Sequence, residues 1–262
     1  MKVTLVQTDI KWSDPSANRQ EAERLMMQAE RSDLYVLPEM WTTGFATEPE
    51  CIAEELDNVT GTIVTLRWMR QMAKKYDTAI AGSVAVKTHD GTFRNRFYFI
   101  TPDSELFYDK RHLFKYGGED KCYVSGNERT VVEWRGVRFL LQICYDLRFP
   151  VFSRNKGDYD AAIYVANWPD SRRRVWDTLL TARAIENQCY VIGVNRIGDD
   201  PQCHYDGGTA VIDAYGRTTV QADDNVQQTV TASLDIEKLH VFRQKFPVIA
   251  DGDDFCLADF TD

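Results

Sequence analysis

Hydrophobic and polar residues alternate with two different periods along the chain, and this alternation predicts strands separated by helices. The residues Ser13-Asp14-Pro15 form a helix start signal before a polar helix that we expect over 15–31. The apolar run 34–37 is typical of a buried strand. A helix over 62–76 and a strand over 78–86 repeat this order. The predicted helix carries one apolar face, formed by Ile63, Leu66, Met69, Met72 and Ala73.

The rest of the chain predicts further strands, one long helix and a short C-terminal helix. The expected helix covers residues 172–187. The strands are expected at 95–101, 105–109, 131–134, 138–143, 161–166, 189–195, 209–213, 218–222 and 228–234. Helices alternating with strands in both halves, together with hairpins, predict an α/β fold in which two sheets pack face to face with helices outside.

Length and composition favour one large domain that acts on a small molecule. The chain has 262 residues, of which 44% are hydrophobic, so it can bury a substantial core. We expect a single domain over residues 1–245 and an acidic, aromatic C-terminal arm over 246–262. Its formal net charge of −9 disfavours binding to nucleic acid or to an anionic membrane.

The cysteines and histidines predict neither a metal site nor a disulfide framework. The six cysteines form no CxxC pair, and the four histidines lack the i, i+4 spacing of a helical metal site. We therefore expect reduced thiols, no metal and no cofactor. No apolar stretch reaches the roughly 18 residues of a membrane span, and the opening residues MKVTLVQTDI form a short strand pattern with no long apolar region of an export signal behind it, which favours a cytoplasmic protein.

Three segments each place a chemically capable residue directly after an apolar strand. The first is Val36-Leu37-Pro38-Glu39, in which the Glu39 carboxylate should be partly desolvated. Desolvation makes a carboxylate a stronger base than one in water, so Glu39 is a candidate general base. Taken alone, this segment favours the alternative, a glutamate that only caps a turn.

The second segment is Leu106-Phe-Tyr-Asp-Lys110-Arg-His-Leu-Phe114, a basic patch within apolar neighbours. A buried Lys110 ammonium would stabilise an anion, either a thiolate or the oxyanion of a tetrahedral intermediate. The alternative is that Lys110 and Arg111 form ordinary surface ion pairs.

The third segment is Phe139-Leu-Leu-Gln-Ile-Cys144-Tyr-Asp-Leu-Arg148, in which Cys144 ends a strongly apolar strand and a helix start follows. We expect a sharp turn that exposes the sulfur and directs the Tyr145 backbone N–H at an oxyanion. We also expect the nearby helix N-terminus to lower the pKa of Cys144. The alternative is an inert cysteine in the core.

The three segments resemble, in their residues and in their order along the chain, those of the carbon-nitrogen hydrolase family, also called the nitrilase superfamily. The resemblance rests on LPEMWTTGF at Glu39, YDKRHLF at Lys110 and QICYDLRFP at Cys144, and it extends to AGSVAV, YVANWP and RAIENQCYVIGVNRIG. It implies a four-layer α-β-β-α sandwich with a Glu, Lys, Cys triad. A second glutamate follows the lysine in many family members, and Glu119 matches that place.

The resemblance also implies an assembly and a substrate class. Members of the family usually form dimers, so we expect a homodimer whose C-terminal arm crosses to the partner. Within the family, the segments YDKRHLF, CYDLRFPVFSRN and YVANWP look most like omega-amidases, which hydrolyse the terminal amide of 2-oxoglutaramate or 2-oxosuccinamate through a cysteine thioester.

Such substrates carry a carboxylate, for which an arginine is a suitable partner. Arg172, Arg173 and Arg174 are the candidates, although at least two of them should lie outside the pocket because adjacent residues on a helix face different directions. Phe45 and Trp168 are candidates for the pocket walls, with the ordinary core as the alternative. A nitrile or N-carbamoyl hydrolase of the same family, or a catalytically silent binding scaffold, remain the alternative functions.

Overall fold

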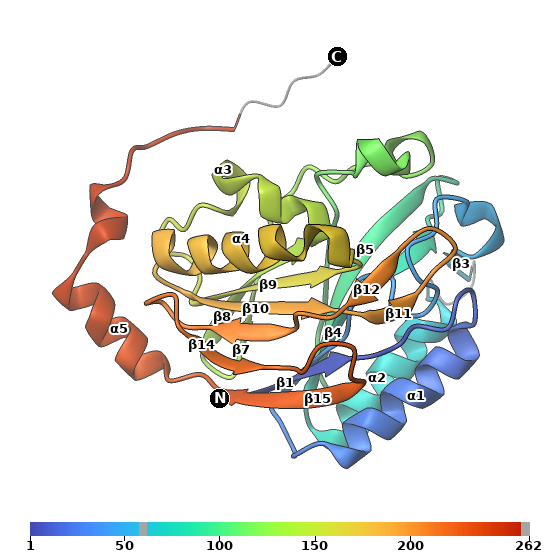
Figure 1. Ribbon diagram of the computed structural model, residues 1–262, viewed down its shortest axis with the longest axis horizontal. Coiled ribbons are helices and arrows are strands. Elements are labelled where there is room, and N and C mark those ends of the chain that lie inside the picture. The colour runs from blue at the N-terminus through green and yellow to red at the C-terminus, as the bar shows by residue number, and fades with distance from the viewer. Residues whose placement is uncertain (58–61, 258–262) are drawn as a thin grey trace.

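The computed structural model describes residues 1–57 and 62–257, and within them the chain forms four layers (Figure 1). Two large sheets pack face to face, with α1 (Pro15–Gln28) and α2 (Val64–Tyr76) outside one sheet and α3 (Pro150–Ser153) and α4 (Arg173–Glu186) outside the other. This arrangement confirms the predicted α-β-β-α sandwich.

The first sheet has the strand order β15-β1-β2-β4-β5-β6, with β3 paired to β4. Strands β1, β2 and β4 are parallel, whereas β15, β5 and β6 run antiparallel to their neighbours. The bounds are β1 Lys2–Gln7, β2 Leu34–Val36, β3 Glu54–Glu55, β4 Ala79–Lys87, β5 Phe93–Ile100, β6 Glu105–Asp109 and β15 Gln228–Ser233.

The second sheet has the order β14-β13-β10-β9-β8-β7. Its central strands β8, β9 and β10 are parallel, so their carboxyl ends lie at the same edge. The bounds are β7 Val131–Trp134, β8 Val137–Ile143, β9 Ala161–Ala166, β10 Tyr190–Asn195, β13 Ala210–Ile212 and β14 Thr218–Gln221.

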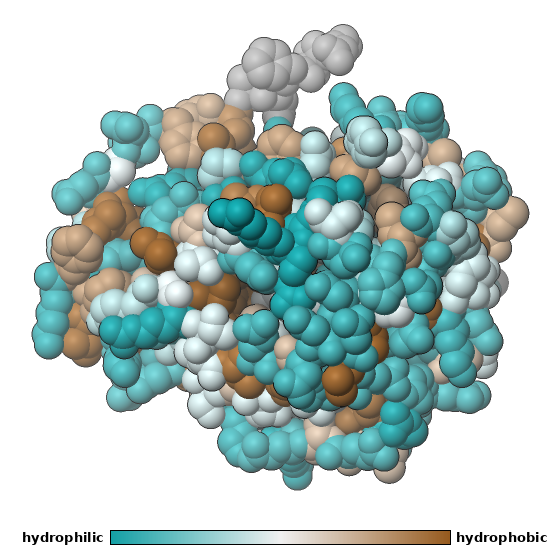
Figure 2. All heavy atoms as spheres, in the orientation of Figure 1, coloured by the Kyte–Doolittle hydropathy of each residue, from teal (hydrophilic) through white to brown (hydrophobic). Residues whose placement is uncertain are grey.

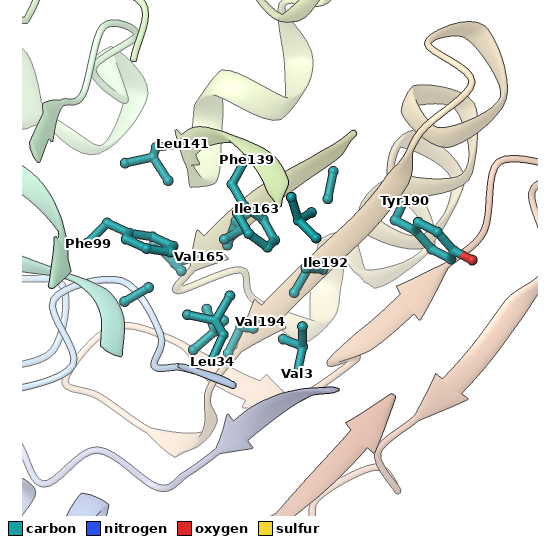
Figure 3. Packing of buried hydrophobic residues seen from close by; sticks show 14 of the residues in the cluster. Val3, Leu34, Phe99, Phe139, Leu141, Ile163, Val165, Tyr190, Ile192 and Val194 are labelled. Atoms are coloured by element: carbon teal, nitrogen blue, oxygen red, sulfur yellow. The ribbon is translucent and has the colours of Figure 1, made fainter. Parts of the chain in front are cut away.

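Three apolar layers hold the four structural layers together. The layer between the sheets contains residues from both, among them Phe99 and Phe139, whose ring centroids are 5.7 Å apart (Figure 3). A second layer lies between the first sheet and α1 and α2, and includes Leu66 and Met69. A third lies between the second sheet and α4, around Trp176. The alternation of side chains along each strand supplies both faces of each sheet.

Helix bounds differ slightly from those expected. The Asp14 side chain accepts a hydrogen bond from the Ala17 N–H (3.0 Å) and starts α1, as the start signal predicts. The helix ends at Gln28 rather than at Arg31, because Ala29 is already extended. The other predicted helices and strands agree within about two residues. A hairpin of β11 (Ile197–Asp199) and β12 (His204–Asp206) was not expected from the sequence.

The last described part of the chain consists of α5 (Ile236–Lys245) and an arm that runs along the outside of the molecule (Figure 1). The Gln188 amide donates to the Phe246 carbonyl (2.8 Å), and the Lys156 ammonium donates to the Phe255 carbonyl (3.0 Å). On the face shown in Figure 2, hydrophobic residues gather over α5 and the segment after it. Crossing of the arm to a partner stays a prediction, and residues 258–262 lie outside the described part.

No helix in the described residues is both long enough and apolar enough to cross a membrane.

Candidate active site

Glu39, Lys110 and Cys144 come together in one pocket at an edge of the sandwich. Glu39 follows β2, Lys110 follows β6 and Cys144 follows β8, so strands from both sheets deliver them to the same place. Local geometry helps, because Met40 (φ 41°) and Cys144 (φ 44°) adopt left-handed backbone conformations that turn the chain sharply after the strand.

Lys110 lies between two carboxylates. Its ammonium donates to Glu39 Oε1 (2.8 Å) and to Glu119 Oε2 (2.8 Å), and the side chains of all three residues have no exposed surface. The backbone N–H of Phe114 also donates to Glu119 Oε2 (2.6 Å). The structure therefore places Glu119, predicted only from the resemblance, at the site, whereas its neighbour Asp120 is exposed.

The charges of this cluster do not balance, since one ammonium faces two carboxylates. Burial raises the pKa of Glu119, and the charge of Glu39 adds to this effect against the opposing attraction of Lys110. Burial alone would lower the pKa of Lys110, but Glu119 and Glu39 outweigh it and raise that pKa. The two carboxylates therefore favour the charged form of Lys110, and together they outnumber it as charges.

Cys144 occupies the sharp turn that the sequence predicts. It begins the short 3₁₀ helix η4 (Cys144–Arg148), and its thiol donates to the Asn167 carbonyl (Sγ···O 3.9 Å). The Ile143 N–H donates to Asp146 Oδ2 (2.9 Å) and fixes the turn. Tyr145 lines the same pocket and lies in the first turn of η4, where N–H groups lack partners within the helix.

The expectation that a helix N-terminus lowers the pKa of Cys144 is wrong. Burial raises the pKa of the thiol well above its usual value, and the negative charge of Glu39 raises it further, while Lys110 opposes both. The helix that follows is too short to offset these effects, because η4 spans only five residues. The resting cysteine is therefore a thiol that needs a base.

Two asparagines at the site escaped the sequence analysis. Asn95 Nδ2 donates to Glu39 Oε1 (2.8 Å), and the Asn167 backbone N–H donates to Glu39 Oε2 (2.9 Å). Asn167 follows β9 directly, as Cys144 follows β8, and this position was the available signal. For Asn95 the signal was a polar residue at a position of β5 that alternates in register with the apolar Phe97 and Phe99.

Asp146 joins the turn at Cys144 to the segment that carries Lys110. Its carboxylate accepts hydrogen bonds from the Tyr108 hydroxyl (2.8 Å) and from the His112 N–H (3.0 Å). Tyr108 belongs to β6 of the first sheet, and Ile143, which also donates to Asp146, belongs to β8 of the second. The buried aspartate therefore bridges the two sheets beside the reacting groups.

Both predicted wall residues, Phe45 and Trp168, line the pocket. So do Arg172, one of the predicted arginines, and Arg148, which was not singled out for substrate binding. The Arg148 guanidinium lies 5.1 Å from the Trp168 ring centroid, and that of Arg172 lies 5.4 Å from the Phe114 ring centroid. Stacking of this kind fixes a guanidinium while leaving its N–H edge free.

The expectation that Arg173 binds substrate is wrong. Its guanidinium forms ion pairs with Asp177, Asp206 and Asp224, at 2.9–3.0 Å, away from the pocket lining. Arg174 is exposed. Successive residues at the start of α4 face different directions, so only Arg172 of the three reaches the pocket.

The arrangement supplies the parts of covalent acyl transfer: a thiol, a buried carboxylate beside it and a fixed cation. In the described residues, no group of three or more His, Cys, Asp or Glu side chains is arranged to hold a metal.

Comparison with known proteins agrees with this geometry. Residues 2–244 match the model of the family described as carbon-nitrogen hydrolase. The chain belongs to the carbon-nitrogen hydrolase family. It is 46% identical over 259 residues to a protein named omega-amidase YafV from Yersinia enterocolitica, with 98% of each chain covered. It is 33% identical to a 2-oxoglutaramate amidase from Bacillus subtilis, covering 95% of this chain and 96% of that protein.

Solved structures of the carbon-nitrogen hydrolase superfamily share the fold. A superfamily protein from Xanthomonas campestris, crystallised with an arsenic adduct in its active site, superposes with a TM-score of 0.92 at 43% identity, with 98% of this chain and 99% of that chain covered. Nit3 from Saccharomyces cerevisiae, described as a member of branch 10 of the nitrilase superfamily, gives a TM-score of 0.85 at 26% identity, covering 95% of this chain and 94% of that one. The family, together with named omega-amidase relatives at 45–46% identity over nearly the full chain, makes this chain an enzyme of the amidase type.

Proposed function

We propose that this enzyme is an omega-amidase, which hydrolyses the terminal amide of a small 2-oxo acid amide such as 2-oxoglutaramate or 2-oxosuccinamate. The products are the 2-oxo dicarboxylic acid and ammonia, and Cys144 carries the acyl group as a thioester. The names of the relatives at 46% and 33% identity support this substrate class.

Attack begins with proton transfer from Cys144 to Glu39. Because the pKa of the thiol is raised, a neighbouring base must take the proton as the sulfur attacks the amide carbon. The proton moves between neighbouring groups of one cluster, so the net charge of the buried site does not change. This avoids the cost of creating a new charge in a buried place.

Lys110 and the Tyr145 N–H then stabilise the oxyanion of the tetrahedral intermediate. Protonated Glu39 returns its proton to the leaving nitrogen, and ammonia departs. Glu39 next removes a proton from water, which attacks the thioester, and then returns that proton to the leaving sulfur, so that the acid is released and the Cys144 thiol is restored. Glu119 holds Lys110 in place through both half-reactions.

The observation that carries the substrate assignment is the pair of arginines in the pocket wall. Within the described ranges, neither Arg148 nor Arg172 forms a salt bridge with an acidic residue, although both line the pocket. Two unpaired guanidinium groups there fit a substrate that brings its own carboxylate. An N-carbamoyl amino acid shares this feature and is the second candidate, whereas a simple nitrile does not.

The test is ammonia release from 2-oxoglutaramate, glutamine, an aliphatic nitrile and an N-carbamoyl amino acid. We expect 2-oxoglutaramate to be the best substrate, and Cys144→Ala to abolish turnover while the circular dichroism spectrum stays unchanged. Cys203→Ala is the matched control, since Cys203 lines the same pocket away from the cluster, and it should retain turnover. Turnover by Cys144→Ala would refute the assignment of Cys144 as the nucleophile. A preference for the carbamoyl compound would change the proposed substrate class to N-carbamoyl amino acids.

The arginine assignment has its own matched pair, Arg172→Met and Arg173→Met. Loss of a charged hydrogen bond to the substrate carboxylate should lower kcat/KM for 2-oxoglutaramate about tenfold or more in Arg172→Met. Arg173→Met removes an adjacent arginine whose partners lie outside the pocket, and it should change kcat/KM less than threefold. Equal effects of the two substitutions would contradict a carboxylate contact at Arg172.

We also propose that the enzyme acts as a homodimer in the cytoplasm. Val151 of α3 and Ile185 of α4 are 53% and 52% exposed on the outer layer, which favours a covering partner. Light scattering of the purified protein tests this, and a monomer at micromolar concentration would contradict it.

A further inference from the structure

Asn95 lies at the centre of the active-site cluster although it carries no charge. It is 1% exposed on β5, on the strand face that also places Phe97 and Phe99 between the sheets. Its Nδ2 atom donates to Glu39 Oε1 (2.8 Å) and to Glu119 Oε1 (3.1 Å). Asn95 is therefore a neutral donor that both carboxylates share, as they share Lys110.

The orientation of the Asn95 amide follows from its surroundings. The opposite orientation would place Oδ1 against two carboxylate oxygens, so only Nδ2 can face them. In the described part of the chain, Oδ1 has no hydrogen-bond partner, although it is buried. An unpaired buried carbonyl costs free energy. Asn95 occupies this place despite that cost, which indicates that its two N–H groups are the part of the amide that matters here.

A count of lone pairs on Glu39 shows what these N–H groups do. Oε1 accepts from Lys110 Nζ (2.8 Å) and from Asn95 Nδ2 (2.8 Å), which uses both of its lone pairs. Oε2 accepts from the Asn167 N–H (2.9 Å), and its other contact, with Asn167 Nδ2, is 3.5 Å long. Oε2 is therefore the oxygen that can still take a proton.

We propose that Asn95 is a positioning residue that saturates Glu39 Oε1 and so directs the proton of Cys144 to Oε2. In this step the S–H bond breaks, an O–H bond forms at Oε2, and the electron pair stays on sulfur. Neither Asn95 nor Lys110 can accept a hydrogen bond from a protonated Oε1 through these donor atoms, so protonation there would displace at least one of the two bonds. The inference rests on the proposed function, in which Glu39 is the base.

The backbone of Asn95 adds a second constraint on the same cluster. Its carbonyl accepts the Lys110 N–H (3.0 Å), so one residue fixes the lysine backbone and both partners of the lysine side chain. A side-chain substitution at Asn95 leaves this backbone bond in place. It therefore tests the amide alone.

The test is Asn95→Leu, which has a similar size and no N–H donor. Hydrogen bonds to a carboxylate favour its charged form, and Asn95→Leu removes one such bond from each carboxylate of the cluster. We expect the acid limb of the pH profile of kcat/KM to move up by about one pH unit, with kcat about tenfold lower and KM changed less than threefold. Asn95→Ala serves as the second variant if leucine prevents folding.

Asn155→Leu is the matched control. Asn155 is also buried and donates two hydrogen bonds, to the carbonyls of Tyr159 (3.1 Å) and Asn187 (3.0 Å), away from the pocket lining. It should lower the melting temperature and leave the acid limb unchanged. An acid limb that stays within about 0.2 pH units of wild type in folded Asn95→Leu or Asn95→Ala would overturn the proposal.

A second readout separates this inference from the substrate assignment. Alkylation of Cys144 by iodoacetamide, followed by mass spectrometry, also requires removal of one proton from the Cys144 and Glu39 pair, and its acid limb should move in the same direction. If wild type turns over none of the amides but the alkylation limb moves in Asn95→Leu, the proposed function fails and the role of Asn95 stands. If amides are hydrolysed and neither limb moves, the role of Asn95 fails alone.

Discussion

Buried carboxylates lie beside both ends of β9, one at the amino end and two at the carboxyl end, in opposite electrostatic surroundings. At the amino end of β9, Asp160 accepts from Arg138 Nη2 (2.9 Å), Arg243 Nη1 (3.1 Å) and His240 Nε2 (3.1 Å). At the carboxyl end, Glu39 and Glu119 share Lys110. One end therefore has an excess of donors for its acid, and the other has an excess of acids.

The pKa values diverge accordingly. Burial opposes ionisation of Asp160, but hydrogen bonds from Arg138 and His240 outweigh it and hold its pKa at about 2. Burial and a like charge raise the pKa of Glu119 instead. The comparison teaches that a fully compensated carboxylate is a fixed structural ion, whereas an under-compensated pair keeps a proton within reach of the chemistry.

Removing the cation from the under-compensated end should have the largest effect. Lys110→Met leaves two buried carboxylates without a partner, and we expect it to lower the free energy of unfolding by about 3–5 kcal/mol and turnover by about 10³-fold or more. Urea unfolding and ammonia release measure the two effects. Lys156→Met, which affects only the contact with the arm, is the control, and equal stability of both variants would contradict a buried, unpaired cluster.

Neutralising one acid at the same end should separate activity from stability. Glu119→Gln keeps the size of the side chain but loosens its hold on Lys110, so we expect turnover to fall about 10- to 100-fold. The unfolding free energy should stay the same or rise, because the substitution removes an excess buried negative charge. A loss of stability as large as that of Lys110→Met would show that the charges were balanced after all.

Neutralising Asp160, the fully compensated acid, should lower stability and have the smallest effect on turnover. Asp160→Asn should keep turnover per folded molecule within about twofold and lower the unfolding free energy by about 1–3 kcal/mol at neutral pH. The folded pKa of about 2 lies below the usual 3.8, so this stabilisation is present above pH 4 and is lost as the pH falls through 2. Melting temperatures of the two proteins should therefore converge toward pH 2, and a gap independent of pH would contradict the ion-pair account.

Much of the fold could be predicted because it depends on near neighbours in the sequence. The strand before Cys144 is mostly apolar, and α2 carries one apolar face, so the hydrophobic pattern alone identifies them. The hairpin of β11 and β12 could not be predicted in this way. Each of its strands has only three residues, which is too short to show a period, and the hairpin is defined by the pairing of the two strands.

The candidate site also has a part that the sequence could predict and a part that it could not. The sequence alone determined that Glu39, Lys110 and Cys144 follow apolar strands, and its resemblance to one family joined them into a triad. Only the tertiary structure decided which residues complete the site, because the partners of Glu39 lie 56, 71 and 128 residues away along the chain.

The same limit explains both corrections. Arg172 and Arg173 are equivalent by sequence, and only the three aspartates around Arg173 distinguish them. A short helix after Cys144 suggested a lowered pKa, yet burial and Glu39 raise it. A side chain's residue type and secondary structure are set locally, whereas its desolvation and its charged neighbours are set by segments that meet only in the folded chain.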